Sequence, residues 1–324
     1  MLSLSDKVQE WALHAGIDEP DYNVIDEQIE YFAATRYYEY LPTCGPYHDF
    51  RTRLANWLDQ VTSEADRKIL FRLVPEIFFV QQHDMAALYR AEMRGPITRW
   101  YIDLLSIALD DDQAGVRLSD AVSKTWFCPI TDSMQIAEFY HVNHLTGVNH
   151  RPDWRSLLTF GNEDRIRQYM KDHSLERIVL LEDFIGTGSK MEGTLAFAAS
   201  LSPTTPVLAI PLIVCPLGAE EGRRIASLHS NLTFRTLVLF PNNMLLHDNY
   251  TPDEPDIYKE LRGLVKRCYP LVEGAGSLHL YGPYGYRDTG ALLVTYSNCP
   301  DNSLPIIHHQ SDMWNPLFPR SSRL

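Results

Sequence analysis

The stretch RIVLLEDFIGTGSKMEG, residues 177–193, decides the fold assignment of this chain. Its four consecutive apolar residues, 178–181, predict a β-strand that is buried on both faces of a sheet. Two carboxylates, Glu182 and Asp183, follow directly, and a helix is predicted from about Met191. Strands buried on both faces are typical of parallel sheets covered by helices, so we expect the chemistry at the carboxyl end of this strand.

Small and polar residues form the turn between this strand and the next helix: Gly186, Thr187, Gly188, Ser189 and Lys190. Glycines allow successive backbone N–H groups to point into one concavity, and the helix start adds its positive dipole end, so the turn suits a phosphate. A ligand with a phosphate at one end and sugar hydroxyls or a metal ion at the other explains the adjacent acids. The alternative is a plain turn after a buried strand, with both acids solvated.

The stretch resembles the phosphoribosyl pyrophosphate signature of type I phosphoribosyltransferases, in which an apolar strand, two acids and two apolar residues precede a small-residue phosphate turn. The matching residues are 178–181, Glu182, Asp183, Ile185, Thr187 and Gly188, and the sequence departs from the signature at Phe184, Gly186 and Lys190. The resemblance implies that Glu182 and Asp183 are catalytic residues that hold the ribose hydroxyls. It also implies that residues 186–190 bind the 5′-phosphate.

The same resemblance assigns a pyrophosphate loop to Thr131, Asp132 and Ser133, which follow a predicted strand at 125–130. It implies a reaction in which a nitrogen base attacks ribose C1 and pyrophosphate leaves. The implied cofactor is Mg²⁺, held mainly through the ligand, with Asp132 or Asp183 as its side-chain contacts. For Asp132, capping of the following helix is an equal alternative.

A tyrosine-rich segment near the carboxyl terminus, residues 278–309, resembles the tail of a branch of phosphoribosyltransferase-like proteins linked to bacterial conflict and phage defence. The resemblance lies in the pattern Asn-x-Pro-x-Asn-Ser-Leu-Pro, residues 298–305. Tyr284 and Tyr286 are candidates for stacking on a base, and Asn302 for bonding a base edge. The alternatives are a tyrosine-rich surface loop and, for Asn302, a turn-forming role.

The spacing of apolar residues predicts two domains. Residues 1–115 show helical periodicity, with the aromatic residues Phe78 and Phe79 on helical faces. The acidic break at 110–115 is the predicted boundary, and the alternative is a solvated loop within one domain. In residues 116–324, predicted strands at 125–130, 178–181, 207–214 and 233–240 alternate with helices. We therefore expect an α/β domain with a parallel sheet flanked by helices, of the type I phosphoribosyltransferase-like class, preceded by an all-helical domain and followed by a carboxyl-terminal extension.

Composition narrows the classes of partner. The 324 residues carry a net charge of -13, which argues against a broad nucleic-acid or anionic-membrane footprint. Five dispersed cysteines signal neither a disulfide framework nor a zinc site, and His141 with His144 lacks a nearby third ligand, so no metal site made by side chains alone is predicted. The amino terminus does not resemble a secretory signal and no apolar run spans a bilayer, which predicts a cytoplasmic protein.

Three functions follow as hypotheses. The leading one is binding of phosphoribosyl pyrophosphate or a related nucleotide with Mg²⁺, followed by transfer of ribose phosphate, in a bacterial defence system. The second is a non-catalytic nucleotide sensor that uses the same pocket. The third is a scaffold whose helical amino-terminal domain binds a partner protein. The sequence names neither the acceptor base nor the trigger, the partner or the oligomeric state.

Overall fold

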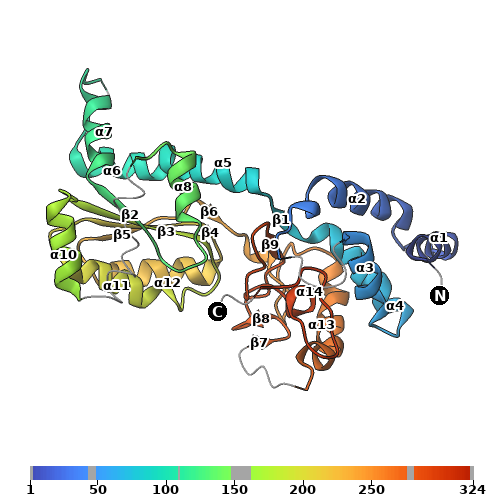
Figure 1. The fold of residues 1–324 in the computed structure, drawn as a ribbon. Helices are drawn as coiled ribbons and strands as arrows, with labels where there is room; N and C mark the ends of the chain where they lie inside the picture. The colour runs from blue at the N-terminus through green and yellow to red at the C-terminus, as the bar shows by residue number, and fades with distance from the viewer. Residues whose placement is uncertain (1–2, 43–48, 109, 147–161, 276–280, 322–324) are drawn as a thin grey trace. The chain divides into compact units, whose positions relative to one another are not determined.

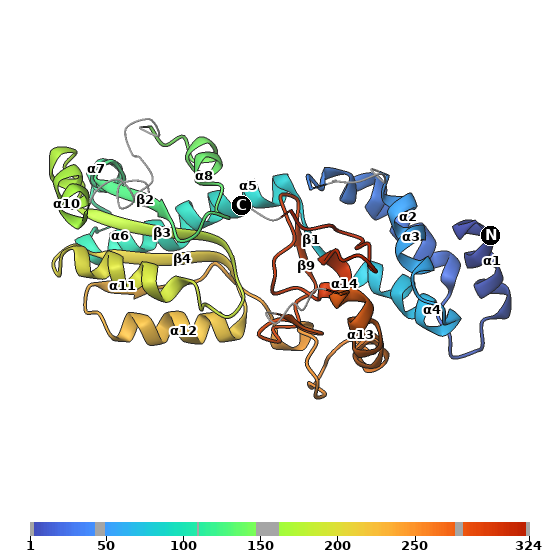
Figure 2. The ribbon, with the colours of Figure 1, turned by 60° about the horizontal axis from the view of Figure 1, so that its bottom comes forward.

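The computed structural model describes residues 3–42, 49–108, 110–146, 162–275 and 281–321. The chain forms two compact units, whose residues can be followed with the colour bar of Figures 1 and 2. Met1–Gln82 and Asn242–Leu324 together make the terminal unit, and residues 83–241 make the sheet unit. This division differs from the single boundary near residue 115 that the sequence suggests.

The terminal unit combines both ends of the chain because the last segment closes the core of the first helices. Strand β1 (Phe78–Val80) pairs in parallel with β9 (Leu293–Thr295). The buried Trp57 donates its indole N–H to the Ile306 carbonyl at 2.9 Å. Phe318 packs edge-on against Tyr37, with ring centroids 5.2 Å apart. The carboxyl-terminal segment is therefore part of this unit's core and not an extension of the α/β domain.

The other elements of the terminal unit are mostly helices. They are α1 (Leu4–His14), α2 (Tyr22–Thr35), η1 (Tyr37–Glu39), α3 (Phe50–Asp59), α4 (Glu64–Leu73), η2 (Val74–Glu76), η5 (Asn242–Met244), α13 (Ile257–Glu273) and α14 (Pro305–His308), with the short hairpin β7 (Tyr281–Gly282) and β8 (Gly285–Tyr286). Phe78 and Phe79, placed on helical faces by their spacing, instead lie in β1, because pairing with β9 overrides local periodicity.

The sheet unit contains a five-stranded sheet in which the described strands pair in parallel, and this confirms the predicted parallel sheet. The order is β2 (Thr125–Pro129), β3 (Arg177–Ile185), β4 (Val207–Val214) and β5 (Leu232–Phe234), and β6 (Val238–Leu239) also pairs with β4. Every residue of β4 is buried, as its continuous apolar run requires. The strand predicted at 233–240 is divided into β5 and β6, which pair with opposite ends of β4.

Helices cover both faces of this sheet (Figure 1). On one face, α10 (Glu163–Asp172), α11 (Met191–Leu201) and α12 (Pro216–Ser227) share a hydrophobic core with the strands. The other helices are α5 (Gln82–Glu92), the π-helical turn η3 (Met93–Ile97), α6 (Thr98–Leu105), α7 (Ala114–Ser123) and α8 (Ile136–Val142). Phe139 of α8 packs on Phe127 of β2 and on Tyr89 of α5, which places these helices against the opposite face.

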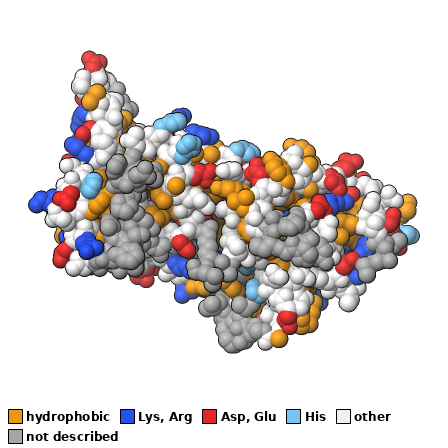
Figure 3. Space-filling view, viewed as in Figure 1, with side chains coloured by type: hydrophobic (Ala, Val, Ile, Leu, Met, Phe, Trp, Pro, Cys, Tyr) orange, Lys and Arg blue, Asp and Glu red, His pale blue; other side chains and the backbone are white. Residues whose placement is uncertain are grey.

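The surface shown in Figure 3 carries Lys and Arg side chains scattered among acidic ones, without one broad basic field on that face. Within the described ranges, no helix has the length and apolar character needed to cross a membrane.

Candidate functional site

Two loops that the sequence singled out lie at one edge of the sheet. Because β2, β3 and β4 are parallel, their carboxyl ends meet at the same edge. The Ile130 N–H donates to the Leu181 carbonyl at 2.8 Å, and the Cys215 N–H donates to the Ile185 carbonyl at 2.8 Å. The segments that follow β2, β3 and β4 are thus fastened side by side.

Glu182 joins the loop after β2 to the strand β3. Its carboxylate accepts hydrogen bonds from the Thr131 N–H at 2.6 Å, from the Thr131 hydroxyl at 2.9 Å and from the Ser133 hydroxyl. Only 1% of Glu182 is exposed, so its oxygens are committed to this loop. The predicted pyrophosphate-loop residues Thr131 and Ser133 are therefore brought together with the first acid of the pair, which acts as their anchor.

Asp183 faces the same loop with one of its oxygens. Its Oδ1 accepts from the Ser133 hydroxyl at 2.9 Å and from the Phe184 N–H at 2.7 Å, which makes Ser133 a bridge between the two acids. Burial raises the pKa of Glu182 well above 4.5, and the adjacent charge and hydrogen bond of Asp183 raise it further, against smaller lowering by Ser133 and Thr131. Glu182 therefore holds a proton more readily than a solvent-exposed glutamate does.

The turn after β3 has the geometry of an anion cradle. Gly188 has φ +76°, and a Cβ there would lie 2.8 Å from Met191 Cε, so the position requires glycine. The backbone N–H groups of Thr187 and Gly188 donate to no acceptor in the part of the chain that the structure describes. The Met191 N–H, the first of α11, donates to the Gly188 carbonyl at 3.0 Å. Two backbone N–H groups that have no acceptor and lie beside the start of a helix are the groups that bind a phosphate in proteins.

Helix α12 supports this turn from the side. A Cβ added to Gly218, in its first turn, would lie 2.7 Å from the Gly186 carbonyl oxygen, and a Cβ on Gly188 would lie 3.2 Å from Glu221 Cβ. Sequence reasoning did not assign a role to Gly218. The signal was present, since Pro216 marks a helix start directly after the buried strand β4, where a glycine permits close approach. The buried Cys215 caps no amide, and burial raises the pKa of its thiol to about 12.

The sequence of this chain was compared with models of protein families, with curated proteins and with solved structures. A model of the family described as PRTase-CE matches residues 54–320. The chain belongs to the PRTase-CE family. This membership gives a phosphoribosyltransferase-like protein, in agreement with the sheet and its strand-end loops. No curated protein and no solved structure matches the chain.

In this PRTase-CE chain, the remaining predicted site residues differ in how exposed they are, and this bears on the predicted Mg²⁺ and phosphate contacts. Asp132 is exposed on the loop after β2, and the N-cap position of α8 is Gln135, whose side chain makes no capping hydrogen bond. Ser189 is half-buried and Lys190 exposed at the end of the phosphate turn. Across the described ranges, no group of three or more His, Cys, Asp or Glu side chains is arranged to hold a metal ion.

The three predicted base-binding residues belong to the terminal unit, and the acid pair belongs to the sheet unit. The Asn302 amide donates to the Thr289 hydroxyl at 2.9 Å, and the Tyr284 hydroxyl donates to Asp248 at 3.2 Å. Asn302 and Tyr284 are buried, whereas Tyr286 is half-buried. Packing within the terminal unit accounts for the first two, and base binding stays a prediction.

Proposed function

We propose that the sheet unit binds phosphoribosyl pyrophosphate, or a related nucleotide, and transfers its ribose phosphate to a nitrogen base. One observation carries the proposal. The turn after β3 presents two backbone N–H groups without an acceptor, and the acid pair just before that turn is hydrogen-bonded to the Thr131 and Ser133 hydroxyls of the loop after β2. Family membership supports the same class of ligand.

Each group then has a distinct task. The amides of Thr187 and Gly188, with the start of α11, take the 5′-phosphate, and Lys190 adds a positive charge nearby. The Thr131 and Ser133 hydroxyls donate to the acids in this structure, and in the proposal they turn to donate to the pyrophosphate when it binds. Asp183 receives the ribose hydroxyls. Glu182 is a positioning residue in this proposal, because its oxygens already hold the loop after β2.

The residues fit a Mg²⁺ ion that is held chiefly by the ligand. Carboxylate oxygens are its preferred protein contacts, and Asp183 with the exposed Asp132 supplies them at this edge of the sheet. When bound, Mg²⁺ would offset the negative charge of pyrophosphate as it leaves. The protein's own contribution is to orient the ribose and to keep the carboxylate of Asp183 near the cationic sugar.

Labelled phosphoribosyl pyrophosphate, incubated with the full chain and a panel of nitrogen bases, tests the proposal. Release of pyrophosphate that depends on one of the bases is the expected result. A chain that neither binds phosphoribosyl pyrophosphate nor releases pyrophosphate from it would contradict the proposal.

A second function, a non-catalytic nucleotide sensor, is favoured by the engagement of Glu182. Because this acid is buried and bonded to Thr131 and Ser133, only Asp183 remains to stabilise a cationic sugar. Saturable binding without pyrophosphate release, with every base tested, would identify a sensor.

We also propose a role in bacterial defence, which rests on the tail pattern at residues 298–305. Expression of the wild-type chain in a susceptible bacterium should lower phage plaque counts, and Asp183→Asn should restore them. Equal counts for cells with and without the chain would contradict the role.

A further inference from the structure

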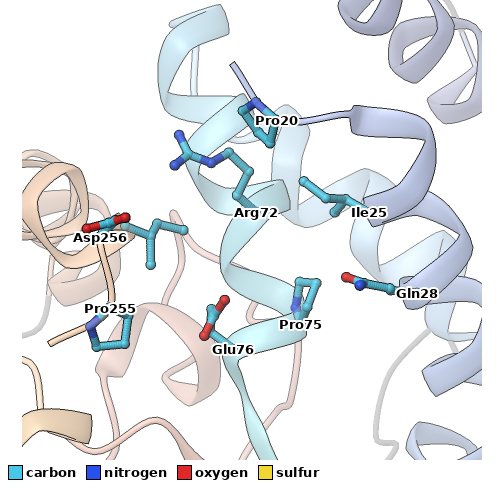
Figure 4. A pocket seen from close by; sticks show the side chains of 9 residues that line it. Pro20, Ile25, Gln28, Arg72, Pro75, Glu76, Pro255 and Asp256 are labelled. Atoms are coloured by element: carbon cyan, nitrogen blue, oxygen red, sulfur yellow. The ribbon is translucent and has the colours of Figure 1, made fainter. Parts of the chain in front are cut away.

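The terminal unit contains a pocket that the proposed function does not use (Figure 4). Its volume is 310 Å³, at the lower end of the range for small-molecule sites. The apolar part of its wall consists of three proline rings and two isoleucines: Pro20, Pro75, Pro255, Ile25 and Ile257. Such a wall fits an aliphatic stem of a few carbons and offers no partner for a polar one.

The charged side chains of the wall are not all paired with a group of opposite charge. Arg72 donates to both carboxylate oxygens of Glu260, at 3.0 and 3.1 Å, so its positive charge is already matched. The carboxylates of Glu76 and Asp256 form no hydrogen bond or ion pair with any residue that the structure describes. Figure 4 shows Glu76 between the rings of Pro75 and Pro255. The pocket therefore presents uncompensated negative charge beside an apolar wall.

The position of Glu76 adds a second reason to expect a cation there. The residue is exposed at the pocket, yet the surrounding walls displace water from its carboxyl and raise its pKa, against partial lowering by Arg72. A partly desolvated carboxylate without a hydrogen-bond partner is stabilised by an incoming positive charge.

We propose that this pocket binds an alkylammonium or alkylguanidinium group, with its stem against the prolines and isoleucines and its charge at Glu76. Two sources supply that chemistry: a free aliphatic amine, or a Lys or Arg side chain of a protein segment. An anion is disfavoured although α13 starts here, because Arg72 is paired with Glu260 and the negative charge of Asp256 stands at the helix start.

Methyl NMR of the full chain, with labelled isoleucines, reads the pocket directly through Ile25 and Ile257. Butylammonium and butylguanidinium should shift both methyl groups saturably, whereas butanol and butyrate should not. Added salt should weaken the effect, because the charges lie near the surface. Absence of shifts with both cations, or equal shifts with butanol or butyrate, would overturn the proposal.

Glu76→Gln should weaken binding of the cations about threefold to fivefold, the range for a partly exposed ion pair. Glu27→Gln is the matched control, since Glu27 is exposed on α2 and lies outside the pocket lining, and it should bind as the wild type does. Unchanged isoleucine spectra of both free variants would show that the fold is intact. An intact Glu76→Gln variant with wild-type affinity would contradict the assignment.

Short peptides distinguish the two sources. A lysine-containing peptide that binds at least tenfold more tightly than butylammonium, with its norleucine analogue silent, supports the site and identifies a protein segment. Binding of the free cations alone supports the site and identifies a small amine. Because the reporters are isoleucines of the terminal unit, these results do not depend on whether the sheet unit binds a sugar phosphate.

Discussion

Burial shifts the pKa of ionisable side chains in the two units of the molecule in different directions. The sheet unit buries the acids Glu92, Glu182 and Asp183, and desolvation raises the pKa of Glu92 and of Glu182 well above 4.5. The terminal unit buries His308, and burial lowers its pKa to about 3. Burial disfavours the charged form in both units, so Glu92 and Glu182 hold their protons more tightly and His308 holds one less tightly. The comparison teaches that the pH response of each unit should have its own sign.

Within the sheet unit, the largest expected effect is the difference in ligand affinity between substitutions of the two adjacent acids. Asp183→Asn should weaken binding of phosphoribosyl pyrophosphate by about 100-fold, because it removes a charge from the strongest class of hydrogen bond. Glu182→Gln should cost no more than about fivefold, since the glutamine has the same length and its carbonyl oxygen still accepts from Thr131. Calorimetry of both variants measures this difference, and equal losses would contradict separate roles.

The free energy of unfolding should change with pH in opposite directions in the two units. Between pH 3 and 6.5 the unfolded chain binds the His308 proton that the folded chain lacks, so the terminal unit weakens as the pH falls. Above pH 4.5 the folded chain keeps protons on Glu92 and Glu182 that the unfolded chain releases, so the sheet unit weakens as the pH rises.

Each of these groups contributes at most about 1.4 kcal/mol per pH unit. Hydrogen exchange of β9 and β3 amides at pH 5 and pH 7, corrected for intrinsic rates, measures the two trends separately. In a His308→Gln variant, which retains a donor for the Ser303 carbonyl, the response of β9 should flatten. Parallel changes in both units would contradict the comparison.

Substitutions that disturb the close packing around the phosphate turn should also weaken ligand binding. Gly218→Ala places a Cβ 2.7 Å from the Gly186 carbonyl oxygen and 2.8 Å from Ile185, so we expect a loss of about 1–3 kcal/mol in stability and weaker phosphate binding. Gly193→Ala in α11 is the matched control, because nothing lies within 4 Å of its added Cβ. It should be neutral or stabilising in thermal unfolding, and similar effects of the two changes would contradict the close contact.

The smallest expected effect concerns Glu92, which neighbours the π-helical turn η3. Both of its carboxyl oxygens are buried, without a hydrogen-bond partner in the described ranges. Glu92→Met should raise the free energy of unfolding at pH 7 by about 1 kcal/mol, because it removes an unpaired buried polar group at similar volume. Urea denaturation checks this, and a loss of stability would indicate that Glu92 has a partner.

The sheet unit could largely be predicted from the sequence. The bounds of β4 follow from one continuous apolar run, and parallel order alone predicts that the loops containing Thr131 and Glu182 meet at one edge. Which of the two acids anchors that loop could not be predicted, because the direction of each side chain depends on tertiary packing.

The terminal unit was harder to predict for a physical reason. Strands β1 and β9 have three residues each and lie more than 200 residues apart, so neither carries a period that distinguishes it from a helix. Their pairing depends on a core that forms only when both ends of the chain are present. Similarly, no signal in the helical pattern around Glu92 indicates that an acid is buried there.

The amides of Thr187 and Gly188 test the central claim most directly. In a ¹⁵N-labelled chain, phosphoribosyl pyrophosphate with Mg²⁺ should move both amide signals downfield saturably, as expected when an undirected N–H gains a phosphate acceptor. Ribose without phosphate should leave them in place. Signals that stay unchanged at saturating phosphoribosyl pyrophosphate would contradict the assignment of this turn as the phosphate site.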